Sequence, residues 1–394
     1  MAALDMTNWR SATTILQTMY QQVTGQTALA ATNTAGFVHQ AETILRAGYD
    51  PILNSVSQVL SRTMFASRPY TRKVRNLYVD EIRYGNHVRK INQIDQPMTE
   101  DVHLDPAVIV DGQSVDQWTI RKPQVVQTNF YGSEGYGDQI TVFRDQINVA
   151  LSGPEEFSRF WAAVMTEIQN KHEQAEETFA RGLLANAIAA KVVADSGNVR
   201  HLVTEYKAYI GETGDINVRA PEHVGNFAKW LAGELKTTLE FLTERTILRH
   251  VNPSQGNIMR HTPFEYQRVM LNTGEMNQVV TRVLADTFHD DLLRTVTYEP
   301  VNFWQAVAGD HMSVQTTPSY FDVASGAQAT GSATRVDNVL GIIFDRDFTG
   351  YTRINEFMDN TGLNKKGRYS NLFWGWTFRY WQDMTENCVI LLLD

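Results

Sequence analysis

Apolar residues in the stretch 1–66 recur with the spacing of short amphipathic helices. The small and polar residues 25–36, and the dipeptide Asp50-Pro51 that suits a helix start, separate these helices from one another. Their apolar stripes are too narrow to stabilise isolated helices, so each must pack against another part of the fold or against another subunit. We therefore expect residues 1–66 to form an N-terminal arm.

The apolar period changes to two between residues 67 and 150, which predicts β-strands. These predicted strands cover 74–79, 82–94, 107–110, 117–127 and 139–149. Arg83, Arg89 and Lys90 surround the dipeptide Gly85-Asn86, which suits the tight turn of a hairpin. The pattern predicts a charged, two-stranded excursion, and such a hairpin needs further contacts to be stable.

A helix start is predicted at Leu151-Ser152-Gly153-Pro154-Glu155-Glu156, which combines a cap residue, a proline and two acids. Apolar residues then keep helical spacing until about Val193. At about 1.5 Å per residue this helix would be ~57 Å long. A helix this much longer than the mean of about 11–12 residues is typical of a scaffold element.

The remainder of the chain mixes helices and strands, so the predicted fold class is α+β. A linker over 196–220 precedes a predicted amphipathic helix from Pro221 to Leu242. Further helices are expected at 263–272 and 275–287, and an exposed loop rich in Ser, Thr, Ala and Gly at 325–334. Strands are expected at 339–344, 373–381 and 388–393.

Composition narrows the classes of function. Lys and Arg total 35 against 44 for Asp and Glu, which gives a formal net charge of −9 and argues against a dedicated nucleic-acid binder. No long apolar run is present, so we expect no membrane span. Cys388 is the single cysteine and cannot form an internal disulfide, which fits synthesis in a reducing cytoplasm.

The sequence offers little catalytic chemistry. The glycine-rich stretch 132–137 lacks the spacing of a nucleotide-binding loop and predicts a turn. Lys171-His172-Glu173 lacks the second histidine of a zinc-binding helix, so together with Glu176 and Glu177 it predicts a solvated or intersubunit acidic face. We predict no catalytic, cofactor or metal site.

Two groups of residues each allow a functional and a structural interpretation. A metal-dependent hydrolase would have to use His289, Asp290, Asp291 and His311, which favour instead the interpretation of polar loop residues. Six aromatic residues crowd into 373–381; base stacking is one interpretation, and packing between a sheet and the long helix is the favoured one.

Several segments resemble the major capsid proteins of tailed bacteriophages, of the Hong Kong ninety-seven type. Ser57–Phe65 followed by Arg68-Pro69-Tyr70, and Asp116–Pro123 leading to Thr128–Gly132, look like segments of short-tailed and gut phage capsid proteins. Gly341–Arg346 is similar to the closing sheet of that fold. The order of arm, β-excursion, long helix, helical unit and returning sheet resembles the family over nearly the whole chain.

The resemblance implies five segments: an N-terminal arm at 1–66, an extended β-loop with peripheral-domain strands at 67–150, a spine helix with peripheral domain at 151–220, an axial domain at 221–335 and a closing sheet at 336–394. It implies a major capsid protein that is made in the host cytoplasm and resides in the virion, where it assembles into hexamers and pentamers. An encapsulin-like nanocompartment shell of the same fold is the alternative.

The partners that the resemblance implies are other copies of this chain, a scaffolding protein, a portal at one vertex and, weakly, the packaged double-stranded DNA; no membrane is expected. For contacts between subunits we predict pairing of Arg83, Arg89 and Lys90 with Glu173, Glu176 and Glu177 of an adjacent long helix.

Overall fold

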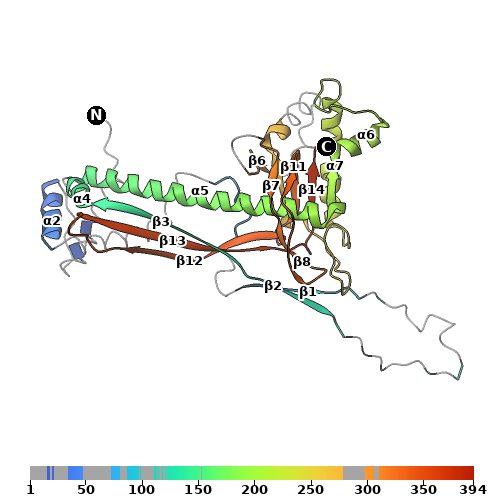
Figure 1. Cartoon of the computed structure of the whole chain (residues 1–394), viewed down its shortest axis with the longest axis horizontal. Helices are drawn as coiled ribbons and strands as arrows, with labels where there is room; N and C mark the ends of the chain where they lie inside the picture. Colours follow the sequence, from blue (N-terminus) through green and yellow to red (C-terminus); the bar gives the residue numbers. More distant parts are fainter. Residues whose placement is uncertain are drawn as a thin grey trace. The chain divides into compact units, whose positions relative to one another are not determined.

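The computed structural model describes residues 16–17, 20–21, 34–47, 72–79, 87–96, 98, 111–112, 114, 118, 120, 122–151, 153–277, 298–305 and 310–394 (Figure 1). They fall into two compact units. The first combines Met1–Arg72, Ser133–Phe179 and Thr352–Arg379; the second combines Lys73–Gly132, Ala180–Tyr351 and Tyr380–Asp394.

The first unit is built on a three-stranded sheet in the order β12-β13-β3. Its strands are β3 (Gly132–Phe143), β12 (Thr349–Asn360) and β13 (Tyr369–Gln382), whose ends extend into the second unit. Helices α2 (Thr34–Ala47) and α4 (Arg144–Ala150) also belong to this unit, and the long helix α5 (Pro154–Ala194) begins in it.

The packing of α5 on β13 explains the aromatic cluster. Trp374, Trp376 and Phe378 alternate along β13 and are buried, as expected for one face of a strand. The ring of Phe378 stacks on Phe179 of α5 with centroids 4.9 Å apart, and Trp376 lies 4.3 Å from the ring of His172. The predicted packing of these aromatic residues between a sheet and the long helix is therefore confirmed.

The second unit is built on a five-stranded sheet in the order β4-β14-β11-β5-β6. These strands are β4 (Val199–His201), β5 (Gln267–Asn272), β6 (Glu299–Val301), β11 (Val339–Asp345) and β14 (Cys388–Leu392). The central strand β11 pairs antiparallel with both β14 and β5, whereas β4 and β6 add in parallel at the two edges.

Helices α6 (Leu202–Ile210) and α7 (Val224–Thr243) pack on one face of this sheet (Figure 1). Their apolar residues form one core with alternate residues of β5, β11 and β14, such as Leu271, Ile343 and Leu391. Every residue of β11 and β14 is buried, which is the pattern of strands covered on both faces. Cys388 of β14 is also fully buried, and burial raises the pKa of its thiol to about 12.

Three two-stranded ladders complete the second unit. Strand β1 (Val88–Gln93) pairs with β2 (Val125–Phe130), β7 (Val314–Thr316) with β10 (Thr334–Val336), and β8 (Ser319–Asp322) with β9 (Ala327–Thr330).

Several predicted elements are confirmed. The long helix begins at Pro154 as predicted and ends at Ala194. The strands expected at 339–344, 373–381 and 388–393 are β11, β13 and β14. The helix expected from Pro221 is α7, which begins at Val224.

Several local predictions are wrong, because contacts with the rest of the fold override local signals. The strand expected at 74–79 is a turn with an isolated bridge at Tyr78, and the linker expected at 196–220 contains β4 and α6. The residues expected to form a helix at 263–272 instead form a 3-10 turn and strand β5, which buries Val269, Met270 and Leu271 within the sheet. The glycine-rich turn expected at 132–137 is part of β3, and the strand expected at 139–149 ends at Phe143, where α4 follows. The loop expected at 325–334 contains β9.

The charged excursion has a different partner from the one predicted. Its proposed turn at Gly85-Asn86, with Arg83, lies outside the described residues. Strand β1 instead pairs with β2. The predicted helix after Asp50 and the strand at 107–110 also lie outside the described residues.

Gly341 tests how tightly β11 packs against β5. A Cβ atom at this position would lie 2.6 Å from the backbone oxygen of Met270 and in contact with the Leu271 side chain. The backbone of β5 can move away from this Cβ atom only at a large cost in free energy. We therefore expect Gly341→Ala to lower the free energy of unfolding by about 2–3 kcal/mol, measured by urea denaturation.

Gly233→Ala is the matched control for this substitution. Gly233 lies within α7 and nothing lies within 4 Å of the position of its Cβ, so alanine there should stabilise the protein by about 0.5–1 kcal/mol. Equal effects of the two substitutions would contradict this account of β11.

Candidate functional site

Strand β1 turns two polar side chains toward the body of the second unit. Its exposed residues Arg89 and Ile91 alternate with Lys90 and Asn92, of which Asn92 is fully buried and Lys90 mostly so. Because side chains alternate across a strand, Lys90 and Asn92 share the inward face. This face carries polar groups where a core face would carry apolar ones.

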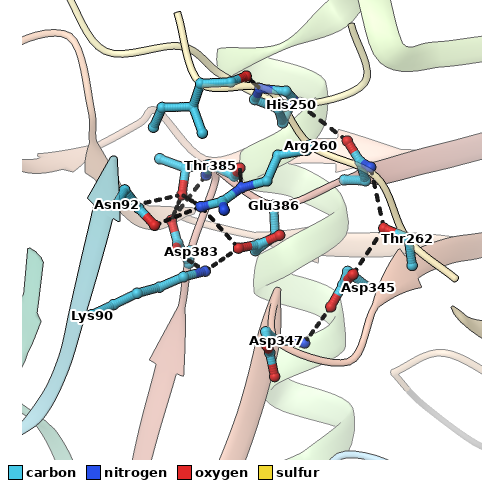
Figure 2. Close-up of polar contacts among 12 residues, drawn as sticks. Lys90, Asn92, His250, Arg260, Thr262, Asp345, Asp347, Asp383, Thr385 and Glu386 are labelled. Carbon is cyan, nitrogen blue, oxygen red and sulfur yellow. Dashed lines mark hydrogen bonds and ion pairs between the residues drawn. The ribbon is translucent and has the colours of Figure 1, made fainter. Parts of the chain in front are cut away.

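The connection between β13 and β14 supplies the acids that these side chains meet. Its residues 383–387 are all buried, although most of them are polar. The Lys90 ammonium nitrogen lies 2.6 Å from Oδ2 of Asp383 and also binds Oε1 of Glu386 (Figure 2).

Arg260 completes this ionic cluster, which we define as Lys90, Asn92, Arg260, Asp383, Thr385 and Glu386. Its Nη2 lies 3.0 Å from Oε1 of Glu386 and donates to Oδ1 of Asn92 at 2.5 Å (Figure 2). The Arg260 Nε donates to the carbonyl oxygen of Thr385 at 3.1 Å. The Thr385 hydroxyl donates to Oδ1 of Asp383 at 2.7 Å and accepts from Nδ2 of Asn92 at 3.2 Å.

The charges within the ionic cluster balance, since two cations face two carboxylates. Burial lowers the pKa of Lys90, but Asp383 and Glu386 more than offset this and the pKa is raised. Burial raises the pKa of Asp383, yet Lys90 and the hydrogen bonds from Thr385 together outweigh burial, and that pKa is lowered. For Glu386, burial outweighs Lys90 and Arg260, so its pKa is raised.

A chain of hydrogen bonds leads from the end of the same connection to the loop that follows α7. Nδ1 of His250 lies 3.1 Å from Oδ1 of Asn387, whose Nδ2 donates to the Thr262 hydroxyl at 3.1 Å. The Thr262 hydroxyl donates to Asp345 at 2.8 Å (Figure 2). Burial lowers the pKa of His250, although its contacts with Ile258 and Asn387 oppose the shift.

This arrangement anchors a strand and offers no reaction centre. Its carboxylates are neutralised by Lys90 and Arg260, and the raised pKa of Cys388 disfavours a thiolate. In the described part of the chain, no group of three or more His, Cys, Asp or Glu residues is placed to hold a metal ion. The helices that the structure describes include none long and apolar enough to cross a membrane.

The sequence-predicted contact residues lie in two separate places. Arg89 is exposed on β1, Lys90 belongs to the ionic cluster, and Arg83 lies outside the described residues. Glu173, Glu176 and Glu177 lie on α5 and are buried. The predicted pairing of these bases with these acids between subunits stays a prediction.

The solvated interpretation of the α5 acids is wrong. Glu176 is fully buried, binds Arg72 and lies 2.9 Å from the guanidinium of Arg353 on β12. The backbone N–H of Arg72 donates to Glu173 at 3.4 Å. Within the first unit, these acids therefore hold residues 72 and 353 against the helix.

The residues of the hydrolase alternative are only partly described. His289, Asp290 and Asp291 lie outside the described residues. Asp310 and His311 are exposed, and Oδ1 of Asp310 accepts from the backbone N–H of Met312 at 2.9 Å, as in a turn.

Sequence reasoning missed Asn92, Arg260, Asp383 and Glu386. The available signal was the polar stretch Asp383-Met384-Thr385-Glu386-Asn387 between two strongly apolar strands. Acids in such a short connection cannot reach far into solvent, so they require cations from elsewhere in the fold.

Comparisons with known proteins agree with this architecture. A family model described as Phi29-like phage major capsid protein matches residues 13–391. No curated protein sequence matches the chain.

Two solved structures are similar in fold. A chain in the capsid structure of Staphylococcus phage Andhra aligns with a TM-score of 0.53 at 10% identity, covering 84% of this chain and 86% of that chain. A chain in the structure of head fiber and inner core protein gp22 of native bacteriophage P68 has a TM-score of 0.53 at 9% identity, with coverages of 84% and 87%. The expected α+β fold of the major capsid type is confirmed.

Substitution of Lys90 tests the anchoring role. Lys90→Met keeps an unbranched side chain but leaves Asp383 without its cation, so we expect a loss on the order of 3 kcal/mol in the free energy of unfolding. Arg89→Met removes the exposed cation next to it on β1 and should change stability by less than about 0.5 kcal/mol. Similar losses for both variants in urea denaturation would refute the anchor.

The pH dependence gives an independent test. Because the pKa of Lys90 is raised on folding, its contribution is complete below the unfolded value of about 10.4 and is lost as pH rises through the folded value. We expect the difference in unfolding free energy between wild type and Lys90→Met to be constant from about pH 8 to 10 and to shrink above that range. A difference that stays constant in strong alkali would show that the ammonium charge is not the source of the stability.

Proposed function

This chain belongs to the family of Phi29-like phage major capsid proteins, and from this premise we propose that it assembles into the hexamers and pentamers of an icosahedral shell that encloses double-stranded phage DNA. Its place in the capsid shell follows from the family. The capsomers, the enclosed genome and the contacts below are the proposal.

The observation that carries the proposal is the exposed apolar surface of the β1–β2 excursion. Ile91, Val125, Trp118, Ile120 and Met98 are all more than half exposed. A two-stranded ladder with apolar residues in water is marginal by itself and gains stability when another surface covers it. The ionic cluster fixes β1 to the second unit, while Ile91 on the other face of the strand stays exposed.

The segment assignment supports the same proposal. We propose that 1–66 is the arm, 67–150 the extended loop and adjoining strands, 151–220 the spine helix with peripheral domain, 221–335 the axial domain and 336–394 the closing sheet. Arg89, which is exposed, would then be available for the predicted contact with acids of a neighbouring helix.

Partners follow from assembly of this kind. We propose that a separate scaffolding protein guides the subunits, that a portal occupies one vertex and that packaged DNA touches the shell weakly. Synthesis in the host cytoplasm fits the single, buried cysteine.

Assembly can be tested on the exposed face of β1. Ile91→Glu places a charge where we propose that a neighbouring subunit packs, so we expect folded subunits but at least ~10-fold fewer shells in negative-stain microscopy after coexpression with the scaffolding protein. The control is Gln328→Glu, which adds the same charge at an exposed residue of the separate ladder β8–β9 and should leave the number of shells unchanged.

The proposed function would be refuted if the wild-type chain stayed a monodisperse monomer under all conditions. Normal shells from Ile91→Glu would count against the extended loop as a contact surface.

A further inference from the structure

The connection between β12 and β13 is a compact basic turn, which we call the β12–β13 tip and define as residues 364–368. Its sequence is Asn-Lys-Lys-Gly-Arg, and all five residues are exposed. It belongs entirely to the first unit, whereas the ionic cluster belongs to the second.

Hydrogen bonds hold the backbone of the tip in one conformation. Oδ1 of Asn364 accepts from the backbone N–H groups of Lys366 at 3.1 Å and Gly367 at 2.9 Å. The N–H of Arg368 donates to the carbonyl of Asn364 at 2.7 Å, and the N–H of Arg144 donates to the carbonyl of Arg368 at 2.8 Å. Arg368 has φ of 56°, a left-handed conformation that a non-glycine residue keeps only where its surroundings fix it.

The cations of the tip have no acidic partner among the described residues. Elsewhere in the same unit an exposed lysine does pair with an acid: the ammonium of Lys171 lies 3.0 Å from the carboxylate of Asp138. In the part of the chain that the structure describes, Lys365, Lys366 and Arg368 have no carboxylate partner. This is unexpected in a chain with an excess of acids, and it concentrates three positive charges on one turn.

The composition of the tip favours phosphate over a protein surface as its ligand. Protein interfaces are depleted of lysine and enriched in aromatic residues, and residues 364–368 include no apolar side chain. Contacts with duplex DNA are instead made largely by Lys and Arg on phosphate oxygens. The chain's net charge of −9 acts weakly at such a contact, because charges further than a Debye length of about 10 Å are screened at 0.1 M salt.

We propose that the β12–β13 tip is a binding site for the phosphate backbone of duplex DNA, without sequence preference. The inference rests on the proposed function, because a shell protein meets DNA at high local concentration. Its ordered backbone keeps the three cations together, so little conformational freedom is lost on binding. The affinity is low and strongly dependent on salt.

The experiment measures binding of the full-length, unassembled subunit to a labelled random-sequence 20-base-pair duplex across a range of salt concentrations. The tip variant combines Lys365→Gln, Lys366→Gln and Arg368→Asn; asparagine tolerates the left-handed conformation at 368. The control combines Arg89→Gln, Lys122→Gln and Lys236→Gln, three exposed cations elsewhere, so both variants change the net charge equally. Circular dichroism verifies that both are folded.

Wild type should show weak binding whose logarithm falls linearly with the logarithm of salt concentration. The tip variant should reduce this slope by about 2.7, which is 0.9 for each of three lost phosphate contacts, while the control keeps the slope of wild type. Equal slopes for the tip variant and wild type, or equal losses in both variants, would overturn the proposal.

Shell assembly of the tip variant separates this inference from the proposed function. Normal shells together with the reduced slope support the site. An unchanged slope with failed assembly would overturn it in favour of a protein contact at the tip, and failure of wild type to form shells would instead refute the proposed function.

Discussion

The pairing of Lys90 and Arg260 with Asp383 and Glu386 is the interaction on which the position of the β1–β2 ladder depends. Charges taken out of water are costly, and such a group is tolerated only where opposite charges and hydrogen bonds replace the lost solvent. Here the four charged groups come from β1, the loop after α7 and the connection between β13 and β14. These ion pairs thus fix the β1–β2 ladder to the second unit.

The first unit also pairs a buried charge with opposite charges, using other residues. Glu176 of α5 is buried, and its carboxylate is paired with Arg72 and with Arg353 of β12. In both units a buried acid joins segments that lie far apart in the sequence. Apolar packing alone would tolerate small shifts of a strand along a helix, whereas a buried ion pair fixes one register.

The apolar pattern of the sequence was sufficient to predict those helices and strands whose buried residues repeat with a single period. The helix from Pro154 and the strands β11, β13 and β14 were predictable because their apolar residues repeat without interruption. Strand β5 was not, since a short apolar run such as Val269-Met270-Leu271 fits a buried helix as well as a strand. The ionic cluster was not predictable at all, because no spacing relates Lys90 to Asp383 until the strands that carry them are paired.

The position of Cys388 has a practical consequence. It is the single cysteine of the chain, it is fully buried in β14, and its thiol resists ionisation. Thiol reagents attack the thiolate, so the native protein offers almost no background to them. A cysteine introduced at an exposed position would therefore be the one site that reacts with a fluorophore or spin label. Labels placed in this way on different surfaces of the subunit could follow each surface during assembly.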